Sequence, residues 1–132
     1  MATTPIYVVS NQDANGLGTP GGVTGLGYAT GVGGAVTQIT GRTTGVTCST
    51  LCGAITLVSA AGSATPASFT VTNTLVAATD TVIVCQKSGT DVYFTSVSAV
   101  AAGSFRITSY TTGGTTTESP VFNFAVVKAV AA

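Results

Sequence analysis

The chain has 132 residues, of which 45% are hydrophobic and only 6% are charged, with four Lys and Arg balancing four Asp and Glu. This length and hydrophobic content are enough to bury one core, which excludes an intrinsically disordered chain. Soluble domains carry about 25% charged residues, so the scarcity of charge indicates a surface largely covered by other copies or by another protein.

The basic residues do not form a patch. They lie singly along the chain, at Arg42, Lys87, Arg106 and Lys128. Duplex binding uses a cluster of such residues, so we expect no nucleic-acid partner. We also expect no membrane span, because the uncharged stretch 43–79 is interrupted by Gly53 and Pro66 and a spanning helix needs about 20 mainly apolar residues. The apolar run at residues 6–9 is too short for a signal peptide.

Residues 1–34 differ from the rest because they are rich in glycine, and we predict an extended N-terminal arm there. Glycine lacks a Cβ and lets the backbone lie close to another surface. An apolar segment of the arm is predicted to add a short strand to a neighbour. The candidate interface residues in the arm are Ile6, Tyr7, Val8, Val9 and Tyr28. A tail without fixed structure is the alternative.

Residues 35–132 are predicted to form an all-β domain, because segments rich in Thr, Val, Ile and Phe are separated by turn residues roughly every 8–12 positions. The predicted strands are 35–40, 45–48, 53–58, 67–73, 80–86, 91–100, 104–111 and 119–128. About eight strands suit a jelly-roll-like β-sandwich. No segment has a helical period, and glycines at 89, 103 and 113 mark turns that favour positive φ.

Alternation of apolar and polar residues predicts which strand faces are buried. In strands 67–73 and 104–111 the buried residues are expected to be Phe69, Val71, Phe105 and Ile107. The last strand is apolar on both faces, as expected of a strand in the middle of a core or at a subunit interface. Its candidate interface residues are Phe122, Phe124 and Val126.

Enzymatic chemistry is not favoured, and we expect no catalytic residue and no cofactor. The chain has no His, which excludes a Ser or Cys triad of the usual kind. The glycine spacing at residues 16–21 matches a dinucleotide-binding pattern, but it lacks the strand before it and the helix after it. A Lys87–Ser88 pair lies beside a predicted turn, where a solvated lysine is expected.

The cysteines and carboxylates are also expected to be non-catalytic. Cys48, Cys52 and Cys85 fall short of a four-ligand zinc site, so no metal is expected and the three thiols are interpreted as small buried groups, with a Cys48–Cys52 bridge as the alternative. The carboxylates lie at or near predicted turns and are expected to be solvated; they are Asp13, Asp80, Asp91 and Glu118.

Two segments resemble a small β module of tailed-bacteriophage virion proteins. They are GYATGVGGAVTQITGRTTGVT at 27–47 and GAITLVSAAGSATPASFTVTNTLVAATD at 53–80, and the pieces VSAVAAGSFRIT and ESPVFNFAVVKAV follow in order. That family includes capsid decoration or cement proteins and the distal parts of fibres. The resemblance implies a jelly roll that sits on the capsid shell as an oligomer, and it implies no catalytic or ligand residue.

The expected function is therefore that of a head cement protein. Its partners would be the major capsid protein and further copies of itself, as a dimer or trimer. It would be made in the host cytoplasm and located on the capsid surface of the virion. The alternative is a tail-fibre or spike tip that binds a host surface glycan, with Tyr93, Phe94 and Tyr110 as the stacking aromatics.

Overall fold

The computed structural model describes residues 17–18, 27–28 and 31–129. The chain divides into two compact units, Met1–Val32 and Gly33–Ala132. In the first unit, β1 (Leu17–Gly18) and β2 (Gly27–Tyr28) pair antiparallel, with Leu17 opposite Tyr28. The second unit is the β domain, and its first strand begins at Gly33, slightly before the expected start at residue 35.

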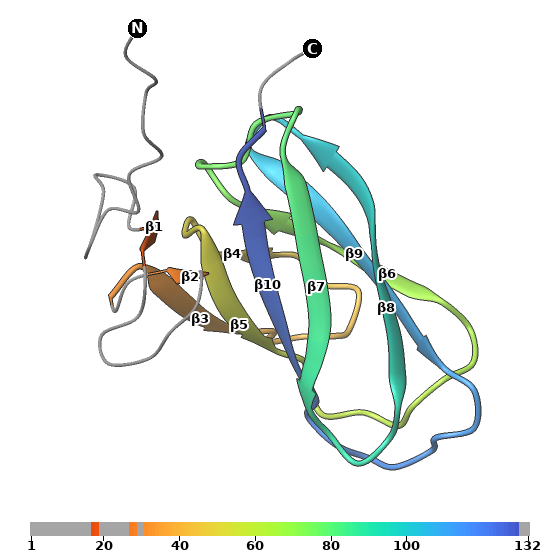
Figure 1. The fold of residues 1–132 in the computed structure, drawn as a ribbon. Coiled ribbons are helices and arrows are strands. Elements are labelled where there is room, and N and C mark those ends of the chain that lie inside the picture. The colour runs from red at the N-terminus through yellow and green to blue at the C-terminus, as the bar shows by residue number, and fades with distance from the viewer. Residues whose placement is uncertain (1–16, 19–26, 29–30, 130–132) are drawn as a thin grey trace, which may run out of the picture. The chain divides into compact units, whose positions relative to one another are not determined.

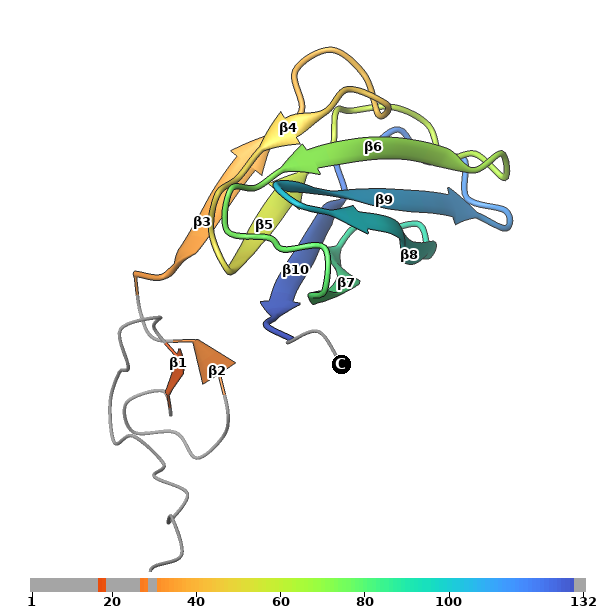
Figure 2. The same cartoon turned by 90° about the horizontal axis from the view of Figure 1, so that it is seen from above.

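The second unit is a β-sandwich of eight strands, which confirms the predicted fold class (Figures 1 and 2). The first sheet has the order β3-β5-β10-β7 and the second sheet the order β4-β6-β9-β8. The strands are β3 (Gly33–Thr37), β4 (Val46–Thr47), β5 (Cys52–Thr56), β6 (Ala67–Thr72), β7 (Thr81–Ser88), β8 (Tyr93–Ala101), β9 (Ser104–Thr111) and β10 (Val121–Val127). Each overlaps one predicted strand, and the described residues contain no helix.

The finer prediction of a jelly roll is not confirmed. β3 pairs parallel with β5, and β4 pairs parallel with β6, whereas a jelly roll is built from antiparallel Greek keys. These parallel pairs arise because the chain crosses to the opposite sheet between the two strands of each pair. Along the chain, β4 of the second sheet lies between β3 and β5, and β5 of the first sheet lies between β4 and β6.

The core lies between the two sheets, whose inward side chains come from alternate positions of each strand. Phe69, Val71, Phe105 and Ile107 are buried there, as alternation predicted. The Phe105 ring of the second sheet packs against the Phe124 ring of the first, with centroids 5.2 Å apart. Each such side chain contributes about 1.5–3 kcal/mol on burial, so these contacts hold the layers together.

Two of the three predicted glycine turns have the expected backbone. Gly89 and Gly103 adopt φ values of +140° and +81°, a region in which glycine is favoured because it has no Cβ. Gly103 lies in the turn that joins β8 to β9. Gly113 does not have a positive φ, so the third turn does not need glycine there for conformational reasons.

Candidate functional site

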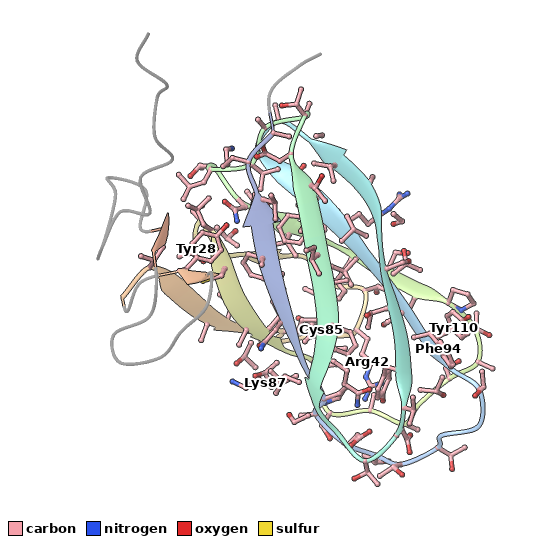
Figure 3. The ribbon with its side chains drawn as sticks, viewed as in Figure 1. Tyr28, Arg42, Cys85, Lys87, Phe94 and Tyr110 are labelled. Carbon is pink, nitrogen blue, oxygen red and sulfur yellow. The ribbon has the colours of Figure 1, made fainter. Side chains whose placement is uncertain are left out.

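The outer face of the first sheet is a shallow surface of small and uncharged side chains. Its floor is formed by Cys52, Ala54 and Ala125, with a hollow of about 420 Å³ above it. Ile83, Cys85 and Lys87 of β7 line one side of that hollow; Figure 3 labels Cys85 and Lys87 on β7. Lys87 is the one charged residue among those that line the hollow.

The outer face of the second sheet is covered by hydroxyl groups that bond to one another. The Ser68 and Thr108 hydroxyls lie 2.7 Å apart, and Thr108 donates to Ser98 Oγ at 2.8 Å. Arg106 Nε donates to the same Ser98 oxygen at 3.0 Å. Because these hydroxyls bond to each other, this face presents a nearly uncharged, ordered polar surface.

An exposed aromatic pair lies on the same face. Phe94 and Tyr110 are opposite each other on β8 and β9, and their rings stack with centroids 5.2 Å apart and planes 17° from parallel (Figure 3). They are 48% and 38% exposed. The structure thus brings together two of the three aromatics predicted to stack on a glycan.

The third aromatic, Tyr93, is in the core. It is 7% exposed and packs edge-on against Phe122. The expectation that it is an exposed stacking residue was wrong, because successive residues of a strand point to opposite faces. With Phe94 outward, Tyr93 must point inward.

Arg42 is half-buried, and no carboxylate of the described residues forms an ion pair with it. Its guanidinium donates to the Tyr93 hydroxyl at 2.7 Å, and its centre lies 5.3 Å from that ring's centroid. It also donates to three backbone carbonyls of two loops. These are the carbonyls of Val58 at 3.2 Å, Ala60 at 2.5 Å and Glu118 at 2.8 Å. Through Arg42, the loop that follows β3 is therefore hydrogen-bonded to the loop at 58–60, to the loop at 118 and to Tyr93 of β8.

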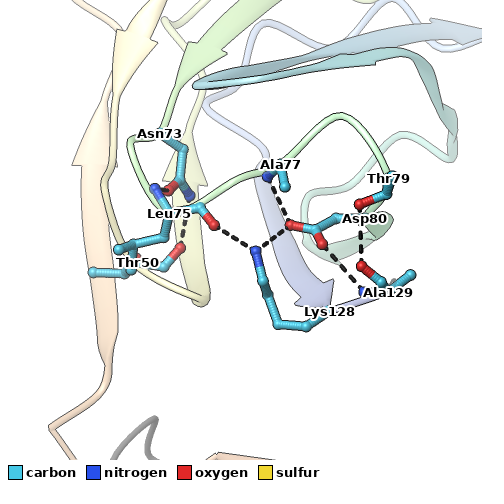
Figure 4. Close-up of polar contacts among 8 residues, drawn as sticks. All are labelled: Thr50, Asn73, Leu75, Ala77, Thr79, Asp80, Lys128 and Ala129. Atoms are coloured by element: carbon cyan, nitrogen blue, oxygen red, sulfur yellow. Dashed lines mark hydrogen bonds and ion pairs between the residues drawn. The ribbon is translucent and has the colours of Figure 1, made fainter. Parts of the chain in front are cut away.

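Asp80 is buried and binds the two residues that follow β10, Lys128 and Ala129 (Figure 4). Its carboxylate accepts from Lys128 Nζ at 2.5 Å and from the Ala77 and Ala129 N–H groups at 2.8 and 3.2 Å. Burial alone would raise the pKa of this carboxyl, but the two backbone hydrogen bonds and the Lys128 ammonium together lower it below its ordinary value. The expected solvated carboxylate was wrong here.

Asp91 and Glu118 are likewise used within the fold. Asp91 is 9% exposed, and its carboxylate accepts from the Thr116 N–H at 2.9 Å. The Glu118 carboxylate accepts from the N–H groups of Thr90 and Asp91. Both side chains bind loop backbone, so the expectation of solvated turn carboxylates was wrong for Asp91 and only partly right for half-buried Glu118.

The predicted interface residues of the last strand lie in the core. Phe122, Phe124 and Val126 are 0%, 3% and 0% exposed, because they point between the sheets. The surface that β10 offers to a partner is the opposite one, which includes Asn123 and Ala125. Ile6, Tyr7, Val8 and Val9 lie outside the described residues, and Tyr28 is half-buried in the first unit.

The three cysteines are free thiols. Cys48 is buried as expected, but Cys85 is exposed, since it shares the outer face of β7 with Ile83. Burial raises the pKa of the Cys52 thiol, and the nearby Cys48 raises it further. No group of three or more His, Cys, Asp or Glu gathers within the described ranges in a way that could hold a metal.

In the part of the chain that the structure covers, no helix could cross a membrane. A comparison of the chain with protein-family models, with curated proteins and with solved structures finds no match.

Proposed function

We propose that this chain is a head decoration protein of a tailed bacteriophage, which binds the outside of the major capsid protein lattice and stabilises the shell. One observation carries the proposal: both sheets have broad outer faces almost free of charge. The first outer face carries Lys87 and the second carries Arg106. The other described charged residues instead bond to loops and termini of the same domain; they are Arg42, Asp80, Asp91, Glu118 and Lys128.

Uncharged polar faces are suited to permanent contact with protein. A Ser or Thr hydroxyl hydrogen-bonds across an interface, and its burial avoids the large cost of desolvating a charge. A decoration protein that contacts two neighbouring capsid subunits loses binding energy when they separate. By mass action, its binding therefore stabilises the closed lattice by RT ln(1 + [L]/Kd), which is about 2.7 kcal/mol at one hundred times Kd.

Capsids lacking the protein provide the test. We expect added protein to raise the temperature at which they release DNA, measured with a DNA-binding dye. Lysine substitutions then identify the face that docks: Ala54→Lys lies on the first outer face and Thr70→Lys on the second, while Thr115→Lys in an exposed loop is the matched control. An unchanged release temperature at saturating protein would refute the proposal, as would equal binding of all three variants.

A second candidate function is binding of a host surface glycan by a fibre or spike tip. The exposed Phe94–Tyr110 stack favours it, because saccharides pack on aromatic rings and the neighbouring Ser96 hydroxyl is suited to a hydrogen bond with a sugar hydroxyl. Immunogold labelling of virions separates the two functions. Label over the head supports decoration, and label at the tail supports glycan binding.

A further inference from the structure

One edge of the first sheet is open. β3 is the terminal strand of the order β3-β5-β10-β7, and the Gln38 N–H donates to the Thr56 carbonyl at 2.9 Å. Because backbone groups alternate in direction along a strand, Gly34, Val36 and Gln38 bond toward β5. The N–H and C=O groups of Gly33, Ala35 and Thr37 point the other way. We call these three residues the open edge; among the described residues no strand pairs with it.

The open edge lacks the devices that block pairing at other edges. Proteins protect edge strands with charge, proline, bulges or very short strands. β7 carries Lys87, β8 has a register shift between Val97 and Ala99, and β4 has two residues. β3 reads Gly-Gly-Ala-Val-Thr and pairs with β5 without a register shift. The outward N–H and C=O groups of β3 can therefore hydrogen-bond to an added strand.

An apolar groove runs beside the open edge. It has a volume of about 440 Å³ and is lined by residues that include Val36, Ile39 and Val46. Ile39 is 88% exposed. A strand added to the open edge would lie next to this groove, so its arrival would cover apolar surface as well as satisfy backbone groups.

We propose that β3 of a second copy occupies the open edge, antiparallel, about a two-fold axis at Ala35. This occupant is favoured because the scarcity of charge, 6% of the chain, indicates a surface covered by further copies, and because an antiparallel strand can pair with its own copy about a central residue. Ala35 exchanges both backbone bonds with the partner's Ala35, while Gly33 faces the partner's Thr37 and Thr37 faces the partner's Gly33. The small side chains do not clash, and no like charges oppose each other. The two sandwiches then share one continuous sheet.

This inference rests on the proposed decoration function and on the homo-oligomer expected from the sequence, and covalent trapping tests the interface separately. Opposed residues of a hydrogen-bonded antiparallel pair have Cα atoms about 5.5 Å apart, within the roughly 4.4–6.8 Å that a disulfide spans. Ala35→Cys, made with Cys52→Ser and Cys85→Ser, should therefore form a disulfide-linked dimer under mild oxidation. The matched control is Ala54→Cys in the same background, because Ala54 lies opposite Ala35 on β5.

In the proposed dimer, both copies of β3 lie between the two copies of β5. The two copies of residue 54 are therefore three strand spacings, roughly 14 Å, apart. We expect Ala35→Cys to cross-link at least about tenfold faster than Ala54→Cys. Equal rates would overturn the proposal. If the unmodified chain sediments as an oligomer while rates are equal, the homo-oligomer stands and this interface fails. A chain that stays monomeric and does not cross-link refutes both.

Ala35→Pro is a second measurement that leaves the monomer intact. The Ala35 N–H points away from β5, so its removal costs no hydrogen bond among the described residues. Circular dichroism checks that the fold is kept. Dimerisation should weaken about tenfold or more, because both N–H donors at the axis are lost. If Ala35→Pro weakens association but Ala35→Cys does not cross-link, the occupant is another strand, such as the arm, and the β3 pairing is refuted.

Discussion

Replacing Arg42 with methionine should be the most damaging change of a charged residue in the sandwich. Methionine keeps the unbranched stem of arginine but removes the guanidinium and its four hydrogen bonds. The carbonyls of Val58, Ala60 and Glu118 and the Tyr93 hydroxyl would each lose a donor. The effect should be large because one guanidinium supplies a donor to acceptors from segments that are far apart in sequence.

The magnitude follows from the number and burial of these bonds. Hydrogen bonds to charged groups contribute about 1.5–3 kcal/mol each, but the loop carbonyls regain water once the guanidinium is gone. We therefore expect a loss of about 3–4 kcal/mol in the free energy of unfolding, within the range for breaking a buried polar network. For a domain of this size, that loss lowers Tm by roughly 15–20 °C.

Urea denaturation followed by circular dichroism measures this loss by linear extrapolation. Arg106→Met is the matched control, since Arg106 is exposed and its side chain donates to Ser98 alone; it should change stability by at most about 0.5 kcal/mol. Arg42→Lys should recover only part of the loss, because one ammonium lacks the fork of the guanidinium. A loss below about 1 kcal/mol for Arg42→Met, close to that of a surface substitution, would refute the reasoning.

Three further predictions concern the loops and thiols. Gly114→Ala should destabilise the fold by about 2 kcal/mol or more by overpacking, since its Cβ would collide with the Asp91 carboxyl, whereas Gly113→Ala meets open space and should be close to neutral in the same denaturation assay. The Asp80 carboxylate stabilises the fold above its unfolded pKa of about 3.9, because its folded pKa is lower. The free energy of unfolding should therefore fall as the pH drops from about 5 through the folded pKa. Asp80→Asn should make the free energy of unfolding depend less on pH over this range, and an unchanged dependence would contradict the prediction. A disulfide reagent should modify Cys85 first, Cys52 more slowly and buried Cys48 last; a faster Cys52 would contradict its raised pKa.

Much of the fold could be predicted from local pattern. Phe69 and Val71 alternate with Thr70 and Thr72, so the pattern alone predicts which face of β6 lies in the core. Gly103 marked the turn between β8 and β9 because a hairpin turn needs positive φ. Such features depend on residues close in sequence, and that is why the boundaries of the strands were nearly right.

The same pattern is ambiguous where both faces of a strand are apolar. Tyr93 and Phe94 are adjacent aromatics, and alternation does not say which of them points inward. In β10 either set of alternate residues could face the core, and the packing of Phe124 against Phe105 of the other sheet settles the choice. Only the pairing of distant strands supplies that information.

By itself, the sequence determined an all-β chain with few charges, since composition and alternation are local properties. The tertiary structure decided where those charges go. Arg42 meets Tyr93 and carbonyls at 58, 60 and 118 only because loops far apart in sequence converge on it. Asp80 is buried because the chain returns with Lys128 at the end of β10. Hydrogen-bond partners are fixed by proximity in space, which local sequence pattern does not contain.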